Sequence, residues 1–541
     1  MKIKESIKRV IVGLLTFSVC VCLMLSSAIS VSAEESDPSE KNDDLKIESD
    51  IEDGDEIHIE GPEGVSPTST PYELRISFDI PDEPPESGGG TKDEPPASGN
   101  GTKEDAFVSG KGTKGDPYII DSAKGFAAFR DCVDNKEVFK DQYIKLVKDI
   151  DLSDFCGKGK GDWNPIGRAD DNSMIFNGSF DGGGHTISGL YIGNGGDYSA
   201  LFAKMNGSGI IKNLNVKGSV NGKYNAAGIV SFSLGTIENC SFVGTVSSTS
   251  KRVGGIGGEC GNIINCSVKG DISAAQQAGG IAGFVKAEKK IEGCKFSGNV
   301  SDVDVVEHSR DNTEFGGIAG FANGDIKNCE ANGDIRGYMD VGGILGTASI
   351  HTTVSNCVFA KGGTVYAGFE LAGGIVGYHC GVSIFNCNNY GSVEAASYDA
   401  GGITGDARGS VSICTNYGNV TGKRDVGGIA GESGKCHDNK GVIHSCSNFG
   451  TVSGTTFVGG IIGAAEYPII SCMNWGSVPG SGDYVGYISG YRGEGAYESG
   501  AGSVFGEGSW VMIIIYSSVT LIVIAAATFF IRRRRSKVRR D

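Results

Sequence analysis

Residues 253–258, VGGIGG, and residues 263–272, IINCSVKGDI, together make the repeating unit that decides the fold. From residue 210 the chain repeats Val/Ala-Gly-Gly-Ile-x-Gly and then Ile/Val-x-Asn-Cys-x-x-x-Gly-x-Val/Ile. The isoleucine of the first element falls at Ile229, Ile256, Ile281, Ile318, Ile344, Ile375, Ile403, Ile429 and Ile461, with Ile488 in a degenerate copy. The cysteine of the second element falls at Cys240, Cys266, Cys294, Cys329, Cys357, Cys387, Cys414, Cys446 and Cys472. Two rows of matching period indicate one structural unit stacked about ten times.

The repeat is built from short strands and turns. The chain has 87 glycines, and they interrupt the apolar positions too often for an amphipathic helix. Only 13 prolines occur and glycine does not recur every third residue, which excludes collagen. Roughly 27 residues make one circuit of three short strands, and successive circuits lie about 4.8 Å apart. The sequence therefore predicts an all-β protein, a parallel β-helix of 10–12 coils over residues 109–490.

The residue before each cysteine is predicted to bend the strand. Isoleucine and cysteine in Ile-x-Asn-Cys are three residues apart, so a straight strand would place them on opposite faces. Asparagine tolerates the left-handed conformation that such a corner needs. Four coils replace it with Gly293, Ile413, Ser445 or Ser471.

The ends of the stack need closing, because each coil buries its apolar residues only against its neighbours. Residues 122–137 have helical spacing after a serine cap and are expected to form the N-terminal lid. Residues 491–509, rich in glycine and serine, are expected to form a spacer after the last coil.

Hydropathy and charge predict a secreted, anchored protein. Residues 1–33 resemble a cleaved signal peptide, with a basic start, an apolar run and small residues before Glu34. Residues 510–531 are apolar enough for a transmembrane helix, and the basic tail 532–541 is expected to stay in the cytoplasm. The ectodomain would then lie outside the cell. No LPxTG-type sorting motif precedes this segment.

An acidic linker is predicted at residues 34–108. Residues 34–105 hold 23 acidic and 5 basic side chains, so this segment alone is more negative than the whole chain, whose net charge is −17. Such a segment buries too little apolar surface to order itself. The acidic balance also argues against nucleic-acid binding, which needs a basic footprint.

The entrance to the repeats resembles a known family. Residues 112–120, GTKGDPYII, then 163–167, WNPIG, and 180–190, FDGGGHTISGL, are similar to the opening coils of bacterial surface β-helices with GLUG-type repeats. Related repeats lie beside the catalytic domains of immunoglobulin A-cleaving zinc metalloproteases. The resemblance covers about residues 109–490 and implies a right-handed β-helix on a bacterial surface, without implying an activity.

The sequence offers little for catalysis. None of the seven histidines lies in HExxH, so zinc proteolysis is not expected, and no cofactor is predicted. Carbohydrate-active β-helices use carboxylates clustered across coils, which a sequence alone cannot locate. Asp181 is the best single candidate, against the alternative of a turn carboxylate that caps backbone amides.

The cysteines are expected to be mostly reduced. The nine repeat cysteines form one inward row, where cysteine acts as a small buried hydrophobe. Cys132 and Cys156, near the lid, are the predicted disulfide if one forms. Cys436, His437, His444 and Cys446 imitate a zinc site, but Cys446 already belongs to the core row.

Four aromatic residues form the predicted ligand site. Each lies three residues after a repeat cysteine: Tyr390, Tyr417, Phe449 and Trp475. Alternation along the strand turns this position outward when the cysteine faces inward. Stacked one coil apart, the rings are expected to present apolar faces to sugar rings or to a partner's aromatic side chains; the alternative is that they only pack a corner of the coil.

Three functions remain open at this stage. The preferred one is a non-enzymatic surface adhesin or binding rod for a host or environmental glycan or protein. The others are a carbohydrate-active enzyme, a lyase or glycoside hydrolase, and a structural spacer. Clustered carboxylates in a cleft would favour the enzyme, and an exposed aromatic row would favour binding.

Overall fold

The computed structural model describes residues 102–168, 173–303, 313–479 and 484–493, and the strand backbone at 498–499 and 502–503. The chain divides into two compact units, residues 1–88 and 89–541, and the described residues all belong to the second. The expected signal peptide, residues 34–101 of the linker, the transmembrane segment 510–531 and the tail 532–541 lie outside the described residues. Among the residues that are described, no helix is both long and apolar enough to cross a membrane.

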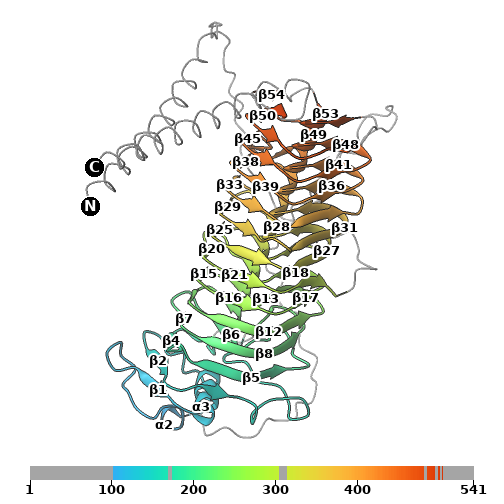
Figure 1. Ribbon diagram of the computed structural model, residues 1–541. Helices are drawn as coiled ribbons and strands as arrows, with labels where there is room; N and C mark the ends of the chain where they lie inside the picture. Colours follow the sequence, from blue (N-terminus) through green and yellow to red (C-terminus); the bar gives the residue numbers. More distant parts are fainter. Residues whose placement is uncertain are drawn as a thin grey trace, which may run out of the picture. The chain divides into compact units, whose positions relative to one another are not determined.

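The second unit is a parallel β-solenoid of about 13 turns (Figure 1). The strands of successive turns pair in parallel and form three sheets, which confirms the predicted all-β parallel architecture.

The first sheet has 14 strands. They are β1 (Tyr118–Ile120), β2 (Tyr143–Leu146), β4 (Ser179–Asp181), β7 (Ile210–Lys212), β11 (Thr236–Glu238), β15 (Asn262–Ile264), β20 (Lys290–Glu292), β25 (Asp325–Lys327), β29 (Thr353–Ser355), β33 (Ser383–Phe385), β38 (Ser410–Ser412), β45 (Ile443–His444), β50 (Ile469–Ile470) and β54 (Glu498–Ser499). The predicted 10–12 coils were too few, because β1, β2 and β4 add N-terminal turns without the repeat cysteine that marks the later ones.

The second sheet has 11 strands. They are β6 (Phe202–Met205), β10 (Val230–Ser233), β14 (Gly257–Cys260), β19 (Ala282–Val285), β24 (Ala319–Ala322), β28 (Leu345–Ala348), β32 (Val376–His379), β37 (Thr404–Ala407), β42 (Ala430–Ser433), β49 (Ile462–Ala465) and β53 (Ser489–Arg492).

The third sheet has 28 strands, which form three connected ladders. The ladder that follows the repeat cysteines contains β3 (Ile150–Asp151), β5 (Thr186–Ile192), β8 (Asn215–Gly222), β12 (Ser241–Ser248), β16 (Ser267–Lys269), β21 (Lys295–Ser297), β26 (Glu330–Asn332), β30 (Val358–Phe359), β34 (Asn388–Asn389), β39 (Thr415–Asn416), β46 (Ser447–Asn448), β51 (Met473–Asn474) and β55 (Gly502–Ser503). The middle ladder contains β17 (Ile272–Ala274), β22 (Val300–Asp302), β27 (Asp334–Gly342), β31 (Thr364–Gly373), β35 (Ser392–Ala395), β40 (Val420–Thr421) and β47 (Val452–Ser453). The last contains β9 (Ala226–Ala227), β13 (Lys251–Gly254), β18 (Gln276–Gly279), β23 (Phe315–Gly316), β36 (Tyr398–Gly401), β41 (Arg424–Gly427), β48 (Thr456–Gly459) and β52 (Val485–Gly486).

An antiparallel hairpin interrupts this regular order. It consists of β43 (Lys435–Cys436) and β44 (Asn439–Lys440), inserted in the chain between β42 and β45. The insertion explains why Cys414 and Cys446 are farther apart than most neighbouring repeat cysteines.

The predicted corner before each cysteine is confirmed. Asn265, for example, has φ 53°, and the substitutes Ile413 and Ser471 keep the same conformation at φ 56° and 53°. The corner is therefore imposed by the stack even where the residue is a poor left-handed former.

The core consists of stacked rows. The repeat isoleucines and cysteines are buried along the interior of the solenoid. Each turn can hide these side chains only because the next turn covers them, so the interior is continuous from turn to turn.

The N-terminal end of the stack carries a helical lid. Helix α2 (Lys103–Ala106) is short, and α3 (Ala123–Asp134) starts at Ser122, whose hydroxyl accepts a hydrogen bond from the N–H of Gly125. Phe126 on α3 stacks on Trp163, with ring centroids 5.7 Å apart. Figure 1 shows α3 at the blue end of the solenoid, where it closes the first turns.

Candidate functional site

The aromatic row lies on the outer surface of the ladder that follows the repeat cysteines. In the turns of β34, β39, β46 and β51, the cysteine is buried, the residue two positions later is buried, and the aromatic residue after that points outward. Tyr390, Tyr417 and Phe449 are 40%, 45% and 45% exposed, and Trp475 is half-buried. The alternation expected from the sequence therefore places these four rings on one face.

The four rings form a continuous stack. Ring centroids are 4.7 Å apart between Tyr390 and Tyr417, 5.1 Å between Tyr417 and Phe449, and 6.0 Å between Phe449 and Trp475. The interplanar angles are 1°, 9° and 7°, so neighbouring faces cover each other. The sequence-based expectation that apolar faces point outward is corrected, because the rings lie nearly parallel at 4.7–6.0 Å and neighbouring rings cover each other's faces. A ligand beside the stack meets ring edges and the tyrosine hydroxyls.

A buried row of asparagines lies directly beneath the rings. Asn389, Asn416, Asn448 and Asn474 are fully buried. The side-chain amide of each of the first three donates to the side-chain oxygen of the next at 2.8–2.9 Å. Each also holds the glycine two residues later, as when Asn416 accepts from the N–H of Gly418 at 3.1 Å and donates to its carbonyl at 2.8 Å.

These asparagine bonds fix the backbone on both sides of every ring. In the earlier turns the same inward position holds an apolar residue instead. The asparagine row was not predicted from the sequence, although its signal was present: Asn-aromatic-Gly recurs in the turns of β34, β39, β46 and β51 and in no earlier turn. The switch from apolar to asparagine occurs where the aromatic row begins.

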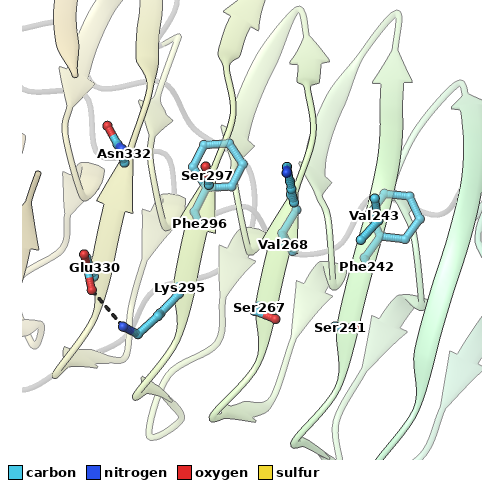
Figure 2. A pocket seen from close by; sticks show the side chains of 11 residues that line it. Ser241, Phe242, Val243, Ser267, Val268, Lys295, Phe296, Ser297, Glu330 and Asn332 are labelled. Atoms are coloured by element: carbon cyan, nitrogen blue, oxygen red, sulfur yellow. Dashed lines mark hydrogen bonds and ion pairs between the residues drawn. The ribbon is translucent and has the colours of Figure 1, made fainter. Parts of the chain in front are cut away.

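A shallow groove of about 330 Å³ lies on the same ladder nearer the N-terminus. Figure 2 shows its side chains on β12, β16, β21 and β26. Lys295 reaches the neighbouring strand, where its Nζ lies 2.9 Å from Oε2 of Glu330. The groove is thus polar and charged at its rim.

The groove and the ring stack share one surface. Strand pairings run without a break from β12 through β16, β21, β26 and β30 to β34 and on to β51. The position three residues after the cysteine is Val243, Lys269, Ser297 or Asn332 in the groove and an aromatic residue in the turns of β34, β39, β46 and β51. A long ligand could follow this face from the groove, whose rim is charged and whose lining includes Phe242 and Val268, to the aromatic rings.

A group of carboxylates occupies a different face. Asp406 on β37 pairs in register with Glu432 on β42, and Asp399 and Asp425 lie on the adjoining strands β36 and β41. Asp406 forms an ion pair with Arg408, whose Nε lies 2.7 Å from Oδ2. Carboxylates from two successive turns therefore gather here, but Asp406 and Asp425 are buried, whereas the enzyme alternative requires carboxylates in a cleft.

Burial dominates the electrostatics of this carboxylate group. It raises the pKa of Glu432 to about 8, with Asp406 and Asp425 adding to the effect. It raises the pKa of Asp425 to about 6, against the opposing charge of Arg424. Carboxyl groups with such pKa values can hold a proton near neutral pH, which is a requirement for general acid catalysis.

Asp181, the single carboxylate chosen from the sequence, is a turn residue. Its Oδ1 accepts from the N–H of Gly183 at 2.9 Å and from the side chain of Asn213 at 3.0 Å. This is the amide-capping arrangement weighed as the alternative to a catalytic role.

The predicted disulfide between Cys132 and Cys156 is wrong. Both side chains are buried and the two are not bonded to each other, because Cys132 packs inside the lid and the thiol of Cys156 donates to the carbonyl of Gly189 at 3.3 Å. The disulfide joins Cys380 to Cys436. Its partners are 56 residues apart and meet only because the inserted hairpin folds back over earlier turns.

The zinc-like sequence pattern of Cys436, His437, His444 and Cys446 does not come together as one cluster. Cys446 is buried in the core row and His444 is exposed on β45. Within the described part of the chain, one group brings three metal-ligand atoms within 4.8 Å of one another: Cys380, Cys436 and His437. The carboxylates on the other face do not converge to that degree.

The nine repeat cysteines are free thiols in the core. The Cys266 thiol donates to the Ile264 carbonyl at 3.3 Å, and its sulfur lies 3.4 Å from the backbone nitrogen of Cys240. Burial raises the pKa of Cys240 and Cys414 well above the usual range. A protonated, covered thiol is a poor nucleophile.

Comparisons with known proteins give short matches. No family model matches the chain. Over 77 residues, 14% of this chain, it is 36% identical to a protein of Evansella cellulosilytica named "Putative Gly-rich membrane protein". Over 118 residues, 21% of this chain, it is 32% identical to Halomucin of Haloquadratum walsbyi. The matched regions span only 9% and 1% of these two relatives.

One solved structure overlaps a larger part of the chain. It is described as a "putative immunoglobulin A1 protease" from Bacteroides ovatus and is 23% identical to this chain. The match covers 57% of this chain and 78% of that one, with a TM-score of 0.35. A likeness at this score carries no argument about activity.

Proposed function

We propose that this protein is a membrane-anchored, non-enzymatic binding rod of a bacterial cell surface, which engages an extended glycan or protein along the ring stack. We also propose that its coils wind right-handed, as parallel crossovers almost always do. The observation that carries the binding role is the stack of four rings on a rigid row of buried asparagines.

Exposure is the argument for binding. Besides the stability that stacking contributes, a row of aromatic rings that is 40–45% exposed supplies apolar area that is already in place for docking. The asparagine bonds hold the rings in position before any ligand arrives, which lowers the ordering cost of binding. The tyrosine hydroxyls supply hydrogen bonds at the solvent edge of the stack.

The anchoring proposal rests on sequence alone. Residues 1–33, 510–531 and 532–541 have the patterns of a signal peptide, a membrane span and a cytoplasmic stop. Protease treatment of intact cells, with antibodies against the repeats and against the C-terminal tail, tests it. We expect the repeats to be digested and the tail to be protected.

The binding role is tested by screening the full-length protein in detergent on glycan and extracellular-protein arrays. A matched variant, Tyr417→Ala with Trp475→Ala, serves as the control for the stack. We expect at least one ligand class to bind the wild type and to show no binding of the variant. Equal retention of both proteins by every ligand would contradict the proposal.

A carbohydrate-active enzyme is the second candidate, and the paired carboxylates Asp406 and Glu432 favour it. Incubation with anionic and neutral polysaccharides, followed by measurement of new reducing ends and unsaturated uronates, tests this role. The Asp406→Asn and Glu432→Gln variants control for contaminating activity. Turnover that both substitutions abolish would establish the enzyme over the binding rod.

A further inference from the structure

The inserted hairpin brings side chains from distant turns together. In the second sheet, His379 on β32, Ala407 on β37 and Ser433 on β42 are in register, so Cys380 lies two turns before the hairpin that carries Cys436. The hairpin must therefore reach back across a whole turn. No repeat position accounts for this contact, because the hairpin is absent from the other described turns.

Hydrogen bonds anchor the hairpin independently of its sulfur atoms. The side-chain amide of Asn439 donates to the carbonyl of Cys380 at 2.9 Å and to that of Ile350 at 3.3 Å. The hairpin thus rests on two earlier turns through Asn439. Breaking the disulfide would leave this attachment in place, so Cys436 would stay close to Cys380.

A histidine completes the cluster. His437 has φ 55°, and its Nδ1 lies 3.5 Å from Sγ of Cys436. The two sulfur atoms and a ring nitrogen of His437 lie within 4.8 Å of one another. Cys380 and Cys436 are only 4% and 2% exposed, while the His437 side chain is exposed. The cluster is therefore buried on its sulfur side and open to solvent on its histidine side.

We propose that Cys380, Cys436 and His437 form a redox-gated Zn²⁺ site. In the oxidised protein the two sulfur atoms are joined and cannot serve as thiolate ligands. A dithiol reductant transfers two electrons and two protons to the disulfide, which gives two protein thiols and the cyclic disulfide of the reductant. Zn²⁺ then binds both sulfurs and Nδ1 of His437, and the two thiol protons are released to solvent.

The donor set selects zinc over the common hard cations. Two thiolates and one imidazole are the soft ligands that Zn²⁺ takes in tetrahedral geometry, whereas Ca²⁺ and Mg²⁺ require oxygen. Solvent supplies the fourth ligand on the exposed histidine side. This site lies away from the ring stack and is independent of the binding role.

The other thiols of the described region do not compete for the ion. The repeat cysteines lie inside the core, and Cys132, Cys156 and Cys260 are also buried. None of them belongs to a group of three ligand atoms at metal-binding distance among the described residues. Zinc uptake should therefore depend on the hairpin cysteines alone.

The test uses the full-length protein in detergent, reduced with a dithiol and freed of it under argon. Zn²⁺ is titrated against a chromophoric chelator, and Co²⁺ is used as a spectroscopic substitute. We expect the reduced protein to bind one Zn²⁺ and the oxidised protein none at this site. Co²⁺ should give a thiolate charge-transfer band and the visible bands of a tetrahedral complex.

Variants assign the ligands. The double variant Cys380→Ser with Cys436→Ser should lose the bound ion. The His437→Ala variant should bind Zn²⁺ at least about tenfold more weakly, since even the loss of a residue that only hydrogen-bonds a metal ligand lowers metal affinity by that factor. The His444→Ala variant removes an exposed histidine outside the cluster and should bind as the wild type does.

Clear results would overturn the proposal. These are failure of the reduced wild type to take up Zn²⁺, or unchanged uptake in the double cysteine variant. If that variant does not fold, His437→Ala decides the matter, because it alters an exposed side chain. Wild-type affinity in His437→Ala, without change in the Co²⁺ spectrum, would exclude the site as drawn.

Discussion

Replacement of Asn416 by alanine should destabilise the solenoid strongly. The Asn416 side chain makes four buried hydrogen bonds: two with Gly418, one with Asn389 and one with Asn448. Asn389 and Asn448 keep their own glycine partners in the variant, but the N–H and carbonyl of Gly418 lose theirs. Each buried polar group without a partner costs about 1–3 kcal/mol, so we expect a loss of about 2–6 kcal/mol.

Denaturant unfolding and hydrogen exchange together measure this effect. Because repeat arrays can unfold in more than one step, exchange at the Gly418 amide is needed beside the global transition. The control is Thr415→Ser on the same short strand, which should change stability by no more than about 0.5 kcal/mol. A loss below about 1 kcal/mol for Asn416→Ala, with unchanged exchange at Gly418, would refute the role given to the asparagine row.

Three further predictions concern the glycines, the thiols and the buried acids. Alanine at Gly418 would place its Cβ 1.7 Å from the carbonyl oxygen of Gly391, so Gly418→Ala should destabilise the solenoid by about 1–3 kcal/mol. The control is Gly368→Ala, whose added Cβ would have its nearest neighbour 3.6 Å away; it should leave stability nearly unchanged in the same unfolding assay. Thiol titration of the folded protein should label few cysteines and titration in denaturant many more; equal labelling in both states would contradict a buried row. Burial raises the pKa of Glu314 to about 8, above its unfolded value, so the folded state binds this proton more tightly and stability should fall as pH rises from about 4.5 to about 8. Melting temperatures at pH 5.5 and 8.5 should show that decline, and Glu314→Gln should reduce it; an undiminished decline would assign it to other groups.

The architecture could be predicted because repetition amplifies weak signals. A single Val-Gly-Gly-Ile stretch says little, but ten copies in phase with the cysteine row allow only a stacked coil. The corner before each cysteine followed from steric preference, and even Ile413 obeys it. The opening coils at residues 112–120 and 180–190 were recognised, but the number of turns was underestimated because β1, β2 and β4 lack the repeat isoleucine and cysteine from which turns were counted.

The candidate site was predictable only in part. Strand alternation correctly turned Tyr417 and its counterparts outward, but the orientation of the rings depends on coil spacing and on the ring of the next turn. Asp406 and Glu432 belong to successive turns, and the sequence did not show that the two residues pair in register. The Cys380–Cys436 contact depends on a hairpin that breaks the repeat, so the period carries no information about it.

Binding by the double variant Tyr417→Ala with Trp475→Ala, measured beside its melting temperature, tests the central claim most directly. The ligand is the one that the array screen identifies for the wild type, and affinity is measured by calorimetry on the full-length protein. Because the Tyr417 ring is 45% exposed and the asparagine row beneath it stays intact, we predict a melting temperature close to that of the wild type. We predict that affinity falls by at least about tenfold, or 1.4 kcal/mol. Unchanged affinity, or a loss of affinity that accompanies a large drop in melting temperature, would show that the rings are structural and would contradict the account.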